Sequence, residues 1–108
     1  MAKYDEYTMS TGAVLTVVCG YTGEEDFYFM HKLADELIAP DESGFSVDSM
    51  CVGGYIRKDG LLLRTSSESP YDDMSFFYDP TKMSEEEVTK VKGWIDQIVD
   101  TLHERRPK

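Results

Sequence analysis

The C-terminal part of the chain carries the feature that most restricts its fold, a one-sided apolar stripe at helical spacing. Ser84 and Glu87 before the stripe form a capping box, and Pro107 after it cannot continue a helix. Gly93 lies inside this segment, although glycine in a helix lowers stability by about 1 kcal/mol relative to alanine. A glycine at this position predicts that a neighbouring element approaches the helix closely there. The apolar stripe consists of Val88, Val91, Trp94, Ile95, Ile98, Val99 and Leu102. A helix with such a stripe must pack it against another apolar surface.

A β-sheet is predicted to supply that surface. Residues 13–19 are apolar on both alternating faces, which favours a central strand covered on both sides. Asp59-Gly60 is a hairpin signal between two further strand-like runs. The strands expected after the first helix cover residues 50–57, 61–64 and 74–78 and form an antiparallel meander. Residues 45–47 either start the first of these strands or form a separate extended piece, and residues 65–73 are expected to form a polar loop. Residues 1–11 are expected to be a loose lead-in or an edge strand.

A first helix is predicted between the first strand and the meander. Thr22 and Glu25 resemble a capping box, and Pro40 stops the helix before a loop at residues 41–44. His31 is expected at the surface or at the core boundary of this helix. The apolar positions at helical spacing are Phe27, Met30, Leu33, Ala34, Leu37 and Ile38.

The predicted order is therefore β-α-β-β-β-α, an α+β two-layer sandwich with a mainly antiparallel sheet and two helices packed on it. The 108 residues suit a single globular domain spanning 1–108, which needs no disulfide or metal for stability. No secretion signal or membrane span is recognisable, so we expect a cytoplasmic, bacterial-type protein. Cys19 and Cys51 lie in apolar runs and are expected to be buried free thiols.

The charge of the chain restricts its partners. The formal net charge is −10, and residues 1–50 hold ten acids and two bases, for a net charge of −8. Direct binding of nucleic acid is disfavoured, because phosphate contacts need clustered lysine and arginine. A basic partner protein is favoured, because an acidic surface steers encounter with positive targets.

No catalytic, cofactor-binding or metal-binding residue is predicted. His31 and His103 stand at no ligand spacing from a cysteine or another histidine. Cys19 precedes a turn and a helix, as reactive thiols do, but Glu24, Glu25 and Asp26 would raise the pKa of its thiol and repel phosphate. We therefore expect a protein that is not an enzyme and needs no cofactor, with a small enzyme lacking a readable motif as the alternative.

Two base-free stretches are the predicted partner-binding regions. One runs from Lys32 to Arg57 and the other from Arg64 to Lys82, and both are expected to contribute to one acidic face. Tyr71 is the expected anchor, because tyrosine offers a large contact area with few rotatable bonds. The candidate residues are Asp35, Glu36, Asp41, Glu42, Glu68, Tyr71, Asp72 and Asp73.

This profile predicts an acidic cytosolic protein-binding inhibitor. The preferred hypothesis is an immunity protein that neutralises a basic toxin, such as a nuclease, by electrostatic docking and occlusion. One alternative is a small adaptor or chaperone-like subunit, homodimeric through an exposed sheet edge. Another is a phage-encoded inhibitor of a nucleic-acid-binding host protein.

Overall fold

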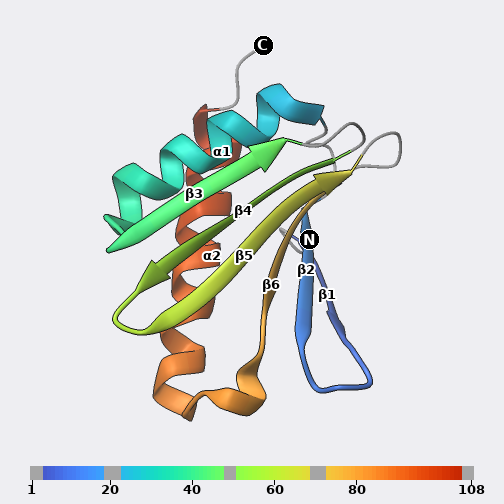
Figure 1. The fold of residues 1–108 in the computed structure, drawn as a ribbon, viewed down its shortest axis with the longest axis vertical. Coiled ribbons are helices and arrows are strands. Elements are labelled where there is room, and N and C mark those ends of the chain that lie inside the picture. Colours follow the sequence, from blue (N-terminus) through green and yellow to red (C-terminus); the bar gives the residue numbers. More distant parts are fainter. Residues whose placement is uncertain (1–3, 19–22, 48–50, 69–72, 106–108) are drawn as a thin grey trace.

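The structure is a computed structural model and describes residues 4–18, 23–47, 51–68 and 73–105. Six strands form one antiparallel sheet in the order β1-β2-β6-β5-β4-β3 (Figure 1). The helices α1 (Gly23–Ile38) and α2 (Glu85–Arg105) cover one face, and a short 3-10 helix, η1 (Pro80–Lys82), precedes α2. The strands are β1 (Asp5–Thr8), β2 (Val14–Val18), β3 (Glu42–Val47), β4 (Cys51–Lys58), β5 (Leu61–Glu68) and β6 (Met74–Tyr78).

This arrangement confirms the predicted α+β two-layer fold and the antiparallel meander. The N-terminal segment forms the edge strand β1, which was one of its two predicted states. Ser84 and Glu87 form the predicted capping box of α2, since each side chain pairs with the other's backbone amide at 3.2 and 2.8 Å. Cys19 and Thr22 lie outside the described residues, as does the side chain of Cys51, so the expected thiol burial and the first capping box are not addressed.

Two predicted loops are shorter than expected. β3 already begins at Glu42, inside the stretch that we expected to be irregular, and it is a separate edge strand. β5 continues through Thr65 to Glu68, because its backbone still pairs with β4 along this stretch and with β6 as far as Ser66. Ser66 and Ser75, for example, share a hydrogen bond of 2.7 Å across neighbouring strands.

The prediction that the first strand is central and covered on both faces is wrong. β2 is second from the edge, and its burial alternates between buried and half-exposed residues. Val14 and Val18 face the helices, whereas Leu15 and Val17 lie on the other side of the sheet. The second apolar row of this strand therefore belongs to a sheet face that neither helix covers.

The core lies between the helices and one face of the sheet, which we call the helix face. α1 packs on α2 and over β4 and β5, and α2 passes behind β4 and β5 in Figure 1. Both predicted apolar stripes are turned toward this layer. The largest side chains with almost no exposed surface are Phe27, Met30, Ile56, Leu63, Met74, Phe76, Tyr78, Ile95, Ile98 and Leu102.

Polar contacts tie the N-terminal edge of the sheet to α2. The Tyr4 hydroxyl donates a 2.6 Å hydrogen bond to a carboxylate oxygen of Asp96, and Lys92 lies 3.9 Å from Glu6. Burial, followed by the Asp96 contact, raises the pKa of Tyr4. Burial also raises the pKa of Tyr78 on β6, to about 12, so both phenols stay protonated through the neutral range.

Replacement of Trp94 by alanine should destabilise the protein by about 3–5 kcal/mol. The indole is 7% exposed and packs in the core, so its removal leaves a cavity. Urea unfolding monitored by circular dichroism measures this change. Gln97→Ala, at an exposed position of the same helix, is the control and should stay within about 0.5 kcal/mol of the wild type. An unfolding free energy for Trp94→Ala equal to that of the control would contradict the packing.

Gly93→Ala should stabilise the protein by about 0.5–1 kcal/mol. The expectation that a neighbouring element approaches Gly93 is wrong, because a Cβ built there meets no atom within 4 Å. The position is exposed on α2, so alanine gains helix propensity without a steric cost. The same urea titration tests this change, and a decrease in stability would show an unseen constraint at that position.

Candidate functional site

The structure separates the two acidic regions that the sequence analysis expected on one face. Glu42 pairs with Arg57 in the sheet register, whereas Glu68 pairs with Cys51. Those two positions on β4 are six residues apart, which corresponds to about 20 Å. Asp73 directly precedes β6, at the same end of the sheet as Glu68. Tyr71 and Asp72 lie outside the described residues.

The acids at the end of α1 are held by contacts within the protein. The Ser43 hydroxyl donates a 2.7 Å hydrogen bond to Asp35, and Glu36 lies 3.8 Å from Arg105 of α2. A carboxylate oxygen of Asp41 accepts a 3.0 Å bond from the backbone N–H of Asp59. These contacts fix the C-terminal end of α1 against β3 and against the β4–β5 turn.

Glu42 is neutralised by a neighbouring strand. Its carboxylate accepts 2.8 Å and 3.2 Å hydrogen bonds from Arg57 and from the Tyr55 hydroxyl. Partial desolvation, then the contact with Glu42, raises the pKa of Tyr55, and Arg57 opposes this shift. Asp35 and Asp41, in contrast, have no lysine or arginine within ion-pair distance in the described part of the chain. Their negative charges are therefore the ones that remain available at this end of the sheet.

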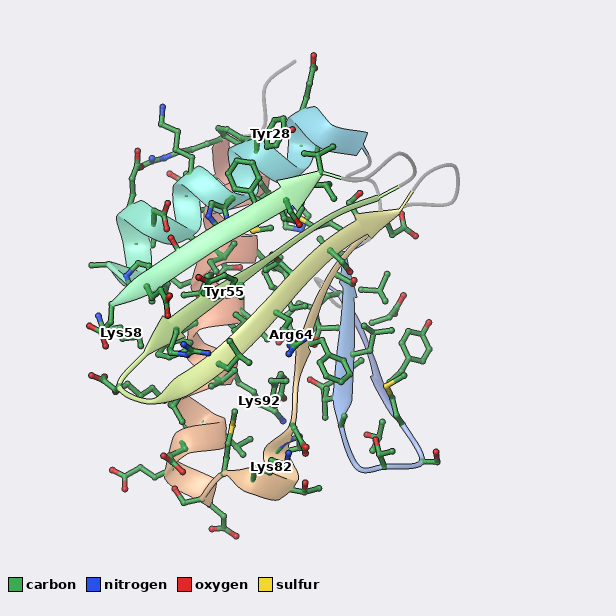
Figure 2. All side chains as sticks on the ribbon, in the orientation of Figure 1. Tyr28, Tyr55, Lys58, Arg64, Lys82 and Lys92 are labelled. Carbon is green, nitrogen blue, oxygen red and sulfur yellow. The ribbon has the colours of Figure 1, made fainter. Side chains whose placement is uncertain are left out.

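An aromatic cluster that the sequence analysis missed adjoins these acids. The Phe45 ring on β3 lies 5.1 Å from the Tyr28 ring and 5.0 Å from the His31 ring, both on α1. Tyr28 is 37% exposed and Phe45 is 50% exposed, while Phe27 beneath them is buried. Figure 2 shows Tyr28 on α1, on the side of the molecule where β3 forms the edge. The exposed rings thus rest on a rigid, buried base.

His31 belongs to this cluster and corrects the expectation of a surface or boundary residue. Its side chain is buried, stacks on Phe27 at 6.2 Å and an angle of 14°, and lies 3.8 Å from Asp35. Its Nδ1 atom has no hydrogen-bond partner among the residues that the structure describes. The spacing of four residues from Phe27 and from Asp35 places all three side chains on one side of α1.

β3 completes this surface with an open strand edge. It is the last strand of the sheet, so the backbone groups along its outer side pair with no other strand among the described residues. Val47, 48% exposed, continues the apolar surface past Phe45. Gly54 permits the arrangement, since a Cβ there would lie 2.8 Å from the Gly44 carbonyl oxygen and 3.1 Å from the Phe45 Cβ. We call Tyr28, Asp35, Asp41, Phe45 and Val47 the α1–β3 edge.

The described residues offer no grouping typical of a metal centre. Within those ranges, no three histidine, cysteine, aspartate or glutamate side chains gather closely enough to hold a metal ion. His103 lies at the exposed end of α2, far in sequence from the buried His31. Neither helix combines the length and the apolar character that a membrane crossing requires, over the part of the chain that is described.

Comparison with known proteins assigns no family to the chain. No protein-family model matches it, and no curated protein or solved structure shows significant similarity to it.

The two phenylalanines of the aromatic cluster should differ in their importance for folding. Phe45→Ala should cost about 1 kcal/mol, because half of the side chain is already in water and its removal leaves no cavity. Phe27→Ala should cost about 3–5 kcal/mol, because the ring is fully buried. Thermal and urea unfolding of both variants measure the difference. Equal losses would mean that Phe45 is a core residue and is not available for binding.

Proposed function

We propose that the protein binds a basic partner protein through the α1–β3 edge. The observation that carries this proposal is the combination of half-exposed aromatic side chains on a buried base with carboxylates that pair with no lysine or arginine of the described residues, beside an open strand edge. Aromatic side chains of this kind are typical anchors at protein interfaces. Asp35 supplies negative charge next to His31 of the aromatic cluster, and Asp41 adds negative charge before β3, four residues from Phe45 along the chain.

The biological role that fits this surface best is inhibition of a basic toxin, as an immunity protein would do. Charges at the rim of an interface accelerate encounter, and apolar anchors at its centre slow dissociation. The net charge of −10 favours fast association with a positively charged target such as a nuclease. Docking across the active surface of such a target would occlude it without any chemistry by the inhibitor.

The free edge of β3 adds a geometric reason for a protein partner. An extended segment of the partner can form main-chain hydrogen bonds along Glu42–Val47 and become a seventh strand. A basic segment would place its charges near Asp35 and Asp41. Self-association through the same edge would instead bring the acids of two copies together, which disfavours a homodimer there. A phage-encoded inhibitor of a nucleic-acid-binding host protein would use the same surface chemistry.

Once a partner has been isolated, association kinetics test this proposal. The double variant Asp35→Asn with Asp41→Asn should slow association about fivefold to tenfold at low salt and leave dissociation nearly unchanged. Phe45→Ala should mainly accelerate dissociation, with a loss of about 2 kcal/mol of binding free energy. Stopped-flow or surface plasmon resonance measurements at two salt concentrations separate the two effects.

A control double variant removes two negative charges at a site away from the α1–β3 edge. Glu85→Gln with Glu86→Gln neutralises two exposed acids at the start of α2 and should change association less than twofold. Asp72→Asn with Asp73→Asn tests the acidic region at the other end of the sheet. If only that pair slows association, the partner binds at the Glu68 end and the α1–β3 edge is the wrong surface. If Phe45→Ala dissociates a dimer of the protein itself, the adaptor hypothesis replaces the inhibitor.

A further inference from the structure

The face of the sheet opposite the helices carries a second surface with a different chemistry. Directly paired residues of an antiparallel sheet point to the same side, so the strand registers define this open face residue by residue. One row crosses all six strands and holds a single charged residue among apolar and aromatic residues and one glycine. From β1 to β3 the row is Tyr7, Leu15, Phe77, Arg64, Tyr55 and Gly44.

Two adjoining hollows lie on this face. The larger has a volume of about 590 Å³ and the smaller of about 340 Å³, and Leu62, Arg64 and Phe77 line both. The larger hollow extends over Gly53 and Tyr55 of β4, and its size is typical of sites for small organic molecules. Figure 2 shows Tyr55 and Arg64 on neighbouring strands of the face that is turned toward the reader.

The charge of this lining is opposite to that of the whole chain. Three bases, Arg57, Arg64 and Lys82, line the two hollows, together with one acid, Asp79. The sequence as a whole has 21 acids and 11 bases. The Asp79 carboxylate is already occupied, since it accepts hydrogen bonds from the amide and the hydroxyl of Thr81. The lining of the two hollows therefore holds more bases than acids, in contrast to the protein as a whole.

Arg64 lines both hollows, and no acid of the described residues compensates its charge. Arg57 pairs with Glu42 at 2.8 Å, whereas Arg64 makes no hydrogen bond or ion pair with another residue of the described ranges. Its register neighbours on either side are Phe77 and Tyr55, on strands that lie about 10 Å apart. In the register, Arg64 is therefore flanked by two aromatic residues, and the donors of its guanidinium group are unused among the described residues.

The hollow beside Arg64 is open because its floor consists of small residues. Gly53 and Ser66 are register partners, and Ser75 pairs with Ser66. A Cβ built on Gly53 would meet only the Thr65 carbonyl oxygen, at 3.8 Å, so a larger side chain would fit there and would fill the hollow. A flat group can therefore lie over Gly53 and Ser66 in the hollow that Tyr55 and Phe77 also line.

We propose that the open face binds a small molecule with a flat apolar body and one oxyanion group, such as a carboxylate or a sulfonate. The oxyanion takes two hydrogen bonds from the Arg64 guanidinium group. The apolar body covers Gly53 and contacts Tyr55, Leu62 and Phe77. A nucleic acid strand is disfavoured as the occupant, because one unpaired arginine cannot offset repulsion between its phosphates and a chain of net charge −10.

Two matched fluorescent probes test the site. 1-Anilinonaphthalene-8-sulfonate carries the flat body and the oxyanion, and N-phenyl-1-naphthylamine has the same body without the charge. Arg64→Gln should weaken binding of the sulfonate about tenfold and change binding of the uncharged probe less than twofold. Arg105→Gln, which removes an exposed arginine paired with Glu36 on the helix side, is the matched control and should leave both affinities unchanged.

A second variant keeps the proposal testable if Arg64→Gln loses its fold. Gly53→Val places a β-branched side chain in a strand, where it is tolerated, and should abolish binding of both probes by filling the hollow. Thermal unfolding confirms that each variant is folded. Equal sulfonate binding by the wild type, Arg64→Gln and Gly53→Val would overturn the proposal. If the wild type sediments as a dimer and Gly53→Val as a monomer, a second copy of the chain occupies the face, which also overturns it.

Discussion

Burial of one side of the sheet beneath α1 and α2 is the interaction on which the rest of the structure depends. Both helices present a single apolar stripe, and together they complete a core against side chains such as Ile56 and Phe76. Because this layer supplies the packing, the opposite face of the sheet is free to carry an unpaired arginine and a glycine floor. The edge strand β3 is likewise free to expose Phe45. The two surfaces proposed for binding are thus the parts of the sheet that the helices do not cover.

The elements that could be predicted from the sequence are those with a strong local signal. The stripe ending at Leu102 and the Ser84–Glu87 capping box define α2, and Asp59-Gly60 defines the β4–β5 turn, where both residues have positive φ. The extent of β5 could not be predicted, because Thr65 and Ser67 are polar, and only the fold shows that they lie on the helix face, where they are buried. The position of β2 depended on strand order, which no local pattern encodes.

Only part of the candidate site could be predicted from the sequence. Clustering of acids in the first half of the chain is visible in the sequence, and it indicated Asp35 and Asp41. The sequence does not show which acids have a partner, because Glu42 meets Arg57 only through the sheet register. The Tyr28–Phe45 contact joins a helix to a strand, so it too requires the fold. One signal in the sequence, Gly53-Gly54, could have indicated that another part of the chain comes close to this strand, because glycine inside a strand often marks such a close approach.

The pairing of β2 with β6 sets the order in which the protein can assemble during synthesis. Val14 lies opposite Tyr78, so this part of the sheet joins residues separated by most of the chain. In the described sheet, the N-terminal hairpin of β1 and β2 pairs further only with β6, so it cannot dock until β6 has been made. Until then the apolar side chains of β2 stay exposed on the nascent chain. Contacts between distant residues also slow folding, so the β2–β6 pairing is a point at which a chaperone would have time to act.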